Sequence, residues 1–240
     1  MVPKRKTGSR PAAERKSLAV LVSGLQKFYG RPAPPVVTAP LDLILWESVA
    51  YLVDDERRAA AFALLKKNAG TTSLQILQAS DAQLLEATRA GGILPELRAQ
   101  RLRQIAELAH WVFKDDLKAM LKKPIREAKN DLMRFPSIGE PGAEKILMLT
   151  RAQPVLALES NGLRVLQRLG FAEEKKSYSA SYKAVQQALQ GQLPSRYDDL
   201  IAAHQLLRQH GQDLCKRTQP LCEGCPLRQS CSFFLAVRRA

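Results

Sequence analysis

Apolar residues recur at the spacing of an α-helix along most of the chain. The first clear run places apolar side chains at positions 18, 21, 22, 25 and 28, on one face of a helix expected over residues 13–29. No segment shows the sustained alternation of apolar and polar residues that is typical of a β-strand. The pattern therefore predicts an all-α protein. Further helices are expected over residues 41–53, 55–68, 71–78, 81–88, 96–114, 116–133, 141–150, 158–168, 179–191 and 197–210.

Two segments near the start of the chain lack this periodicity. Residues 1–12 are basic, contain proline and glycine and have few apolar residues, which is typical of a disordered arm. Residues 30–40 contain four prolines, which break the hydrogen-bond ladder of a helix. This second stretch is therefore predicted to be an extended connection.

All four cysteines lie within 17 residues, in the pattern C-x6-C-x2-C-x5-C. Such bunching favours one metal centre over disulfides, which would be spread across the fold. Disulfides also suit secreted proteins, and no apolar signal segment is visible, so we expect a cytoplasmic location. Zinc remains the alternative, but zinc ribbons usually have two C-x2-C pairs and this chain has one. Uneven all-cysteine spacing favours a cubane iron–sulfur cluster. The expected ligands are Cys215, Cys222, Cys225 and Cys231.

The charge of the chain points to a polyanionic partner. Lysine and arginine number 37 against 23 aspartate and glutamate, a formal net charge of +14. No apolar run approaches the roughly 20 residues that span a bilayer, so no membrane partner is expected. A basic surface beside an iron–sulfur loop favours nucleic acid over electron transfer between proteins. We expect a monomer.

A second motif lies upstream of the cysteines. Residues 131–149, DLMRFPSIGEPGAEKILML, indicate a helix, a short turn and a second helix. Together with the cysteine spacing, this segment resembles the helix-hairpin-helix DNA glycosylases of the endonuclease III superfamily. The resemblance extends from about Leu18 to Phe234 and implies a [4Fe-4S] cluster on the four cysteines.

The resemblance also implies two helical subdomains with a DNA-binding cleft between them. Residues 13–39 and 151–240 would form the cluster subdomain. Residues 40–150 would form a six-helix subdomain that contains the hairpin. Double-stranded DNA that is damaged, mismatched or branched is then the expected partner.

The hairpin turn is expected to bind a DNA phosphate through Pro136, Ser137, Ile138 and Gly139. Gly139 permits an unusual backbone angle, and free N–H groups at the start of the second helix would face the phosphate. Ser137 replaces a family glycine, which is expected to weaken this binding.

The next residues of the hairpin also depart from the family. Acidic Glu140 stands where basic residues are usual. Pro141 falls on the lysine that forms a Schiff base in endonuclease III-type lyases, and it has no amine. Lys145 lies about one turn further along. The resemblance therefore implies no β-lyase activity.

Two carboxylates are candidate catalytic groups. Glu159 falls on the family's catalytic aspartate, and Asn161 matches the motif that follows it. Glu47 falls on the catalytic acid of the adenine-excising members, where it would protonate the departing base. Its apolar neighbours would raise its pKa. The alternatives are that Glu159 only serves a helix start and that Glu47 faces solvent. The family's Q-Q-T segment, which follows this acid, is replaced here by residues 51–53.

Further basic residues are expected to contact backbone phosphates, with a solvated basic face as the alternative. They are Arg98, Arg101, Lys122, Lys216 and Arg217.

Three functions fit these features. The first is a monofunctional DNA glycosylase, favoured because the pair of acids is retained. The second is a non-catalytic DNA-binding protein, favoured by the altered hairpin and the aspartate-to-glutamate change. The third is a bifunctional lyase with a displaced lysine, which Pro141 disfavours.

Overall fold

The computed structural model describes residues 16–237, and all of its regular elements are helices, as predicted. The expected arm at residues 1–12 lies outside the described residues. Among those described, β-type pairing is limited to an isolated bridge between Tyr51 and Gly92. The α-helices are α1 (Leu18–Tyr29), α2 (Pro40–Val49), α3 (Asp55–Asn68), α4 (Ser73–Gln78), α5 (Asp81–Ala90), α6 (Pro95–Glu107), α7 (Leu117–Lys122), α8 (Ile125–Leu132), α9 (Glu140–Leu149), α10 (Ser160–Arg168), α11 (Tyr178–Leu189), α12 (Tyr197–Asp213) and α13 (Ser232–Val237).

The chain divides into two compact units. Unit 1 comprises the described parts of Met1–Arg31, Ser160–Leu193 and Leu206–Ala240, and unit 2 comprises Pro32–Glu159 and Pro194–Gln205. The expected boundaries placed residues 32–39, 151–159 and 194–205 with the cysteines, whereas their contacts lie with the hairpin unit.

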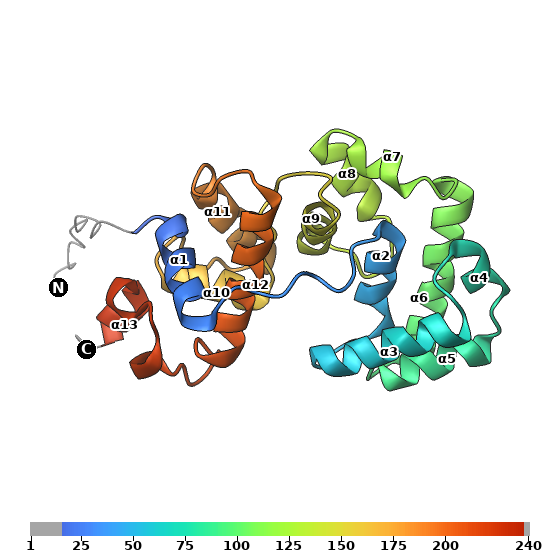
Figure 1. The fold of residues 1–240 in the computed structure, drawn as a ribbon, viewed down its shortest axis with the longest axis horizontal. Coiled ribbons are helices and arrows are strands. Elements are labelled where there is room, and N and C mark those ends of the chain that lie inside the picture. The colour runs from blue at the N-terminus through green and yellow to red at the C-terminus, as the bar shows by residue number, and fades with distance from the viewer. Residues whose placement is uncertain (1–15, 238–240) are drawn as a thin grey trace, which may run out of the picture. The chain divides into compact units, whose positions relative to one another are not determined.

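Unit 2 is built from α2 to α9 around one apolar core. Helices α3 and α5 lie side by side, and α6 packs against α2, α4 and α5 (Figure 1). Helices α4 and α5 each begin with a capping box, from Thr72 and Ser80, which satisfies backbone donors at their first turns. The fully buried core residues include Ile44, Leu45, Leu65, Ile76, Leu84, Leu102, Ile105, Leu132, Ile146 and Leu147.

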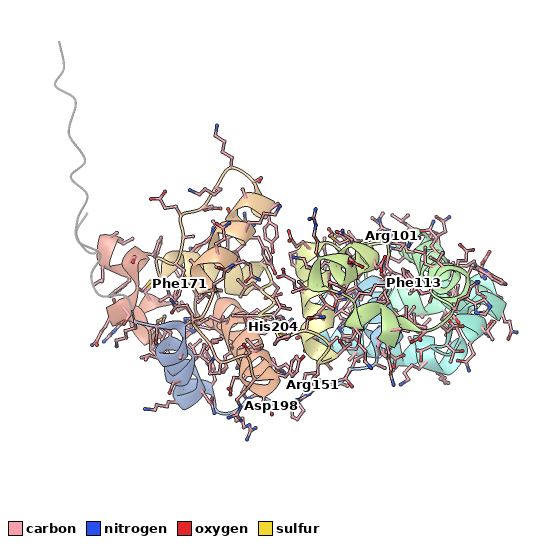
Figure 2. All side chains as sticks on the ribbon, turned by 90° about the horizontal axis from the view of Figure 1, so that it is seen from above. Arg101, Phe113, Arg151, Phe171, Asp198 and His204 are labelled. Carbon is pink, nitrogen blue, oxygen red and sulfur yellow. The ribbon has the colours of Figure 1, made fainter. Side chains whose placement is uncertain are left out.

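The start of α12 belongs to this same unit through polar contacts. Arg151 forms an ion pair with Asp198, and the buried His204 forms a 2.9 Å hydrogen bond between Nδ1 and the carbonyl of Ala157 (Figure 2). These contacts explain why the contact pattern assigns residues 194–205 to the hairpin unit.

Most helices match the expected ranges to within a few residues at their ends, and three departures have a physical cause. The segment 116–133 is broken at Lys123, because Pro124 forces the preceding residue into an extended conformation. The helix expected to 114 turns into a π-helix at Leu108–Val112, followed by left-handed residues Lys114 and Asp115. Helix α2 ends at Val49 rather than at 53, because Tyr51 pairs with Gly92 instead.

Unit 1 packs α1, α10, α11, α13 and the end of α12 around a second core that includes Leu25, Leu166, Tyr182 and Leu207. Helices α10 and α12 approach closely at Gly211, where a Cβ atom would stand 2.7 Å from the Cβ of Asn161. Only glycine allows this approach, which brings the cysteine segment after α12 next to α10.

Candidate functional site

The hairpin turn connects α8 and α9 in unit 2. It is anchored by Phe135 and Ile138, which are buried. The left-handed residue is Ser137, with φ 69°, whereas Gly139 has φ −94° and ψ −177°. Gly139 therefore does not use the unusual backbone angle that a glycine permits. The strained position is the one at which the family has glycine.

Gly139 is exposed and opens α9 without any side-chain cap. A Cβ atom at this position would meet nothing closer than the Cδ of Pro141 at 3.9 Å. Neither φ nor crowding within the protein requires glycine here, so the open backbone leaves room for a ligand to approach the first N–H groups of α9. Pro141 removes one of these donors.

Acidic Glu140 is neutralised within the hairpin unit. Lys129 Nζ lies 2.6 Å from Glu140 Oε1 and 2.7 Å from Glu144 Oε1. Burial opposes the charge of Lys129, but the hydrogen bonds to Glu140 and Glu144 outweigh it and raise the lysine's pKa. Lys129 therefore offsets the unfavourable carboxylate at the hairpin.

Arg98 does not occupy a DNA-contacting position. Its side chain is buried, with 2% of its surface exposed, and its guanidinium donates to the carbonyls of Val49, Thr88, Gly92 and Ile93. Burial, and then the nearby Arg57 and Arg58, lower its pKa. The expected phosphate contact is corrected, because four of the five N–H donors of this buried fork are bonded to backbone carbonyls of unit 2.

Arg57 and Arg58 complete this backbone support. Arg57 donates to the carbonyl of Ala90, and Arg58 donates to those of Trp46 and Ala50. Together with Arg98, they satisfy carbonyls at the C-terminal ends of α2 and α5, where cations are favourable.

The arginines hold two loops that present apolar side chains to solvent. These loops are joined by the bridge between Tyr51 and Gly92. Leu52 and Leu94 both adopt left-handed conformations, with φ 54° and 55°. Sequence reasoning noted residues 51–53 only as a departure from the family and did not single out the second loop. The exposed large apolar residues are Tyr51, Leu52, Ile93 and Leu94.

The remaining basic candidates differ in their surroundings. Arg101 is partly exposed and donates from Nη1 to the Ser137 hydroxyl over 3.1 Å, so it lies at the hairpin turn. Lys122 is exposed at the end of α7 in the same unit. Lys216 and Arg217 are exposed in unit 1, where their carbonyls accept hydrogen bonds from Arg168.

Glu47 is paired rather than surrounded by apolar groups. Its Oε1 lies 2.6 Å from Nζ of Lys145, and the two side chains are 19% and 24% exposed. The pair joins α2 to α9. The expectation of an acid among apolar neighbours alone is corrected, because the carboxylate forms an ion pair with an ammonium on another helix.

The second acidic candidate lies at the start of α10. Glu159 is half-buried and directly precedes the first residue of that helix. Asn161 accepts a 2.8 Å hydrogen bond on Oδ1 from Nη2 of Arg164. Arg164 also donates to the carbonyls of Gly211 and Cys215, so Asn161 belongs to the support of the cysteine segment.

In unit 1, one pocket is lined by all four cysteines, which the spacing alone predicted to converge. Burial, which dominates, raises the pKa of the Cys225 thiol to about 11 in the absence of a metal. The loop that carries the cysteines contains little regular structure beyond two single turns, Cys222–Gly224 and Arg228–Ser230.

Arg168 is the main support of this loop. It donates to the carbonyls of Lys216 and Arg217, and its Nη1 lies 3.3 Å from the Cys215 sulfur. Its guanidinium also stacks 4.7 Å from the Phe233 ring. The sequence analysis did not identify this role of Arg168.

His210 is a second residue whose role the sequence analysis missed. It is 1% exposed, and burial lowers its pKa to about 4. Its Nε2 lies 3.4 Å from the Cys225 sulfur and its Nδ1 lies 3.0 Å from the Tyr29 hydroxyl. Burial, followed by Asp213, raises the pKa of Tyr29. The available signal was the position of His210, which lies five residues before the first cysteine, on the helix that leads into the cysteine loop.

The chemistry of the donor set suits a metal centre. Thiolates are the ligands of iron–sulfur clusters and of closed zinc sites, and four thiols line this one pocket. Within residues 16–237, no group of three or more His, Cys, Asp or Glu side chains is arranged to hold a single metal ion.

No helix in the described part of the chain is both long and apolar enough to cross a membrane. No protein-family model matches the sequence. Known proteins are nevertheless similar. Endonuclease III of Sulfolobus acidocaldarius is 25% identical over 182 residues, which cover 75% of this chain and 76% of that protein. Endonuclease III of Rickettsia prowazekii is 29% identical over 44% of this chain and 46% of its own length.

Solved structures share the fold. A trapped covalent endonuclease III–DNA intermediate has a TM-score of 0.73 and 18% identity, covering 92% of this chain and 97% of that one. A thermostable thymine-DNA glycosylase has a TM-score of 0.71 and 15% identity, covering 91% and 97%. The long sequence match to an endonuclease III, the shared all-α fold and the hairpin upstream of the cysteine loop agree with one another. The chain is thus similar in sequence to endonuclease III and shares the fold of helix-hairpin-helix DNA glycosylases, which supports the resemblance drawn from its motifs.

Proposed function

We propose that this protein is a monofunctional DNA glycosylase of base-excision repair that acts inside the cell and lacks β-lyase activity. The proposal rests on the Glu47–Lys145 pair, in which Nζ of the lysine lies 2.6 Å from a carboxylate oxygen and can donate a hydrogen bond to it. The pair can deliver the lysine's proton through Glu47 to a departing base and be reprotonated from solvent afterwards. The half-buried Glu159 would stabilise the positive charge that develops on the sugar.

DNA would be bound on residues of both units. In unit 2, the open N–H groups at Gly139, together with Arg101 and Lys122, suit backbone phosphates. In unit 1, Lys216 and Arg217 are exposed cations that also suit backbone phosphates. The exposed apolar residues of the two supported loops, such as Leu52 and Ile93, suit the stacked bases that an extruded nucleotide leaves behind.

A second function is favoured by the same ion pair. If Lys145 holds Glu47 permanently as a structural partner, no group at this position releases a proton, and the chain is a DNA-binding protein without catalysis. The strained Ser137 and the missing N–H of Pro141 point the same way, since both weaken the family's hairpin. The two functions are separated by testing damaged, mismatched and branched DNA, because a glycosylase releases a base from such DNA whereas a binding protein only binds it.

The test is a panel of duplexes with different damaged or mismatched bases, assayed for base release and for strand nicking separately. We expect base release from at least one duplex and no nicking of abasic DNA, because Pro141 supplies no amine. Borohydride should trap no covalent complex with the wild type. Pro141→Lys is the positive control, since it restores an amine at the family's position. A wild-type complex that disappears in Lys145→Ala would show a lyase, and no base release anywhere would favour the binding function.

We also propose that the four cysteines hold a [4Fe-4S] cluster. When bound, the group would supply a crosslink of the C-terminal loop and a redox-active centre. The support comes from four thiols that line one pocket and from Arg168, which orders the backbone around them. Protein prepared without oxygen should be brown and contain about four irons per chain. Cys222→Ser should lose iron and order in the C-terminal loop. Stoichiometric zinc without iron would overturn the assignment.

A smaller effect is expected at the hairpin. Ser137→Gly should raise the free energy of unfolding by about 1 kcal/mol, because glycine adopts the left-handed conformation of this residue without steric cost. Chemical denaturation followed by circular dichroism measures the change. Ser137→Ala is the matched control, because it loses the hydroxyl that Arg101 contacts but keeps the strain. Equal stabilisation by both substitutions would show that the hydroxyl, rather than the backbone, is the unfavourable element.

A further inference from the structure

We propose that His210 is a positioning residue of the cysteine centre. It donates a hydrogen bond to the Cys225 sulfur, its ring is fixed by Tyr29, and it thereby raises the reduction potential of the bound cluster. The inference rests on the cofactor proposed above. It goes beyond that proposal because it assigns a redox-tuning role to two residues that are not metal ligands.

Three side chains form a continuous chain in unit 1. The Tyr29 hydroxyl lies 3.0 Å from Nδ1 of His210, and Nε2 of the same ring lies 3.4 Å from the Cys225 sulfur. The Tyr29 and His210 rings meet edge to face, with centroids 5.9 Å apart. His210 is 1% exposed, so water does not compete for either ring nitrogen.

The direction of each hydrogen bond follows from the chemistry of the sulfur. A metal-bound thiolate has no proton and can only accept, so Nε2 must carry the hydrogen. In a neutral ring, Nδ1 is then the acceptor, and it accepts a hydrogen bond from the Tyr29 hydroxyl. Tyr29 therefore selects the tautomer that donates to the cluster. Without it, the other tautomer would leave Nε2 as a lone pair facing a thiolate.

A donor at this sulfur favours the reduced state. Reduction adds negative charge to the cluster, and hydrogen bonds to the sulfurs stabilise that charge. Arg168 makes a comparable contact with Cys215, at 3.3 Å, but it also holds the loop through several carbonyls. Substituting Arg168 would remove the contact with the sulfur and the support of the loop at the same time. His210 has fewer structural contacts and allows the electrostatic effect to be measured on its own.

Tyr29 also links this hydrogen-bonded chain of side chains to the position of α1, because it is the last residue of that helix. Its hydroxyl reaches His210 only while the end of α1 lies against α12. The position of α1 is thus coupled to the hydrogen bond at Cys225, and through it to the potential.

The experiment uses the full chain, prepared without oxygen, with iron content and visible absorption recorded first for each protein. Reduction potentials are then compared for the wild type, His210→Leu, His210→Gln and Tyr29→Phe. We expect His210→Leu to weaken the reduced state by about tenfold relative to the oxidised state, which for a one-electron couple is about 59 mV to lower potential. His210→Gln should retain most of the wild-type value, because its amide places an N–H near the original Nε2. Tyr29→Phe should lie between.

Resonance Raman spectra in H2O and D2O provide a readout that packing alone would not change. Iron–sulfur stretching bands of the wild type should shift on deuteration, because the N–H that contacts Cys225 exchanges. The shift should be lost in His210→Leu and reduced in Tyr29→Phe. His204→Leu is the matched control, since His204 is also buried and hydrogen-bonded but does not line the cysteine pocket.

The outcomes separate this inference from the proposed cofactor. A wild type without iron would overturn both. A fully loaded His210→Leu protein with the wild-type potential and isotope shift would overturn the role of His210 alone. If the leucine variant does not assemble, Tyr29→Phe decides, and wild-type values in that variant would overturn the positioning role.

Discussion

Replacing Arg98 with alanine should cost about 3 to 5 kcal/mol of stability, a large share of the total for a domain of this size. The guanidinium is buried and donates to the carbonyls of Val49, Thr88, Gly92 and Ile93. Alanine would leave these four buried carbonyls without a donor. The higher helix propensity of alanine is far too small to offset that loss of stability. Urea denaturation of both proteins measures the difference.

Arg101→Ala is the matched control for this prediction. It removes an arginine three residues further along α6, where the side chain is partly exposed and contacts Ser137. Its stability should change by less than about 0.5 kcal/mol, whereas its affinity for duplex DNA should fall and the fall should shrink as salt is added. Arg98→Lys should resemble Arg98→Ala, because one ammonium cannot replace a fork that reaches four carbonyls. Equal stability of the alanine variants at 98 and 101 would contradict the structural role of Arg98.

The burial of Arg98 could have been inferred from the sequence. Arg98 lies four and seven residues before Leu102 and Ile105, which are both fully buried, so helical periodicity puts the arginine on the core face. The basic composition of the segment outweighed that signal in the sequence analysis. Its partners are backbone carbonyls at the ends of other helices, and no residue pattern shows where those ends meet.

The convergence of the four cysteines on one pocket was the most predictable feature, because they are close in sequence and their spacing reflects one loop. The helices of unit 2 followed from their apolar faces for the same local reason. The strain at Ser137 was not predictable, since the identity of a residue does not report its φ angle. The pairing of Glu47 with Lys145 was also hidden, because 98 positions separate two residues that the packing of α2 on α9 brings together.

The prediction with the largest catalytic effect concerns this pair. If the protein is a glycosylase, Glu47→Gln should reduce base release by at least about a hundredfold, because the amide cannot pass a proton to the departing base. Duplex affinity should change little, since Glu47 contributes no contact to phosphates. Single-turnover base release and equilibrium DNA binding, measured on the best duplex of the panel, separate the two quantities. Asp42→Asn is the matched control, as it neutralises a carboxylate on the same helix, away from Lys145.

The partner substitution decides what the pair does. In Lys145→Met, the proton source is lost but the carboxylate remains, in a less polar environment that favours its protonated form. A relay through both groups predicts that this variant is also slow at neutral pH and recovers as the pH is lowered, because Glu47 then takes its proton from solvent. Glu47→Gln should not recover, since it has no group to protonate. Full activity of Lys145→Met at neutral pH would mean that Glu47 acts without the lysine. Full activity of both variants would show that the pair only joins α2 to α9, and the proton donor would have to lie elsewhere.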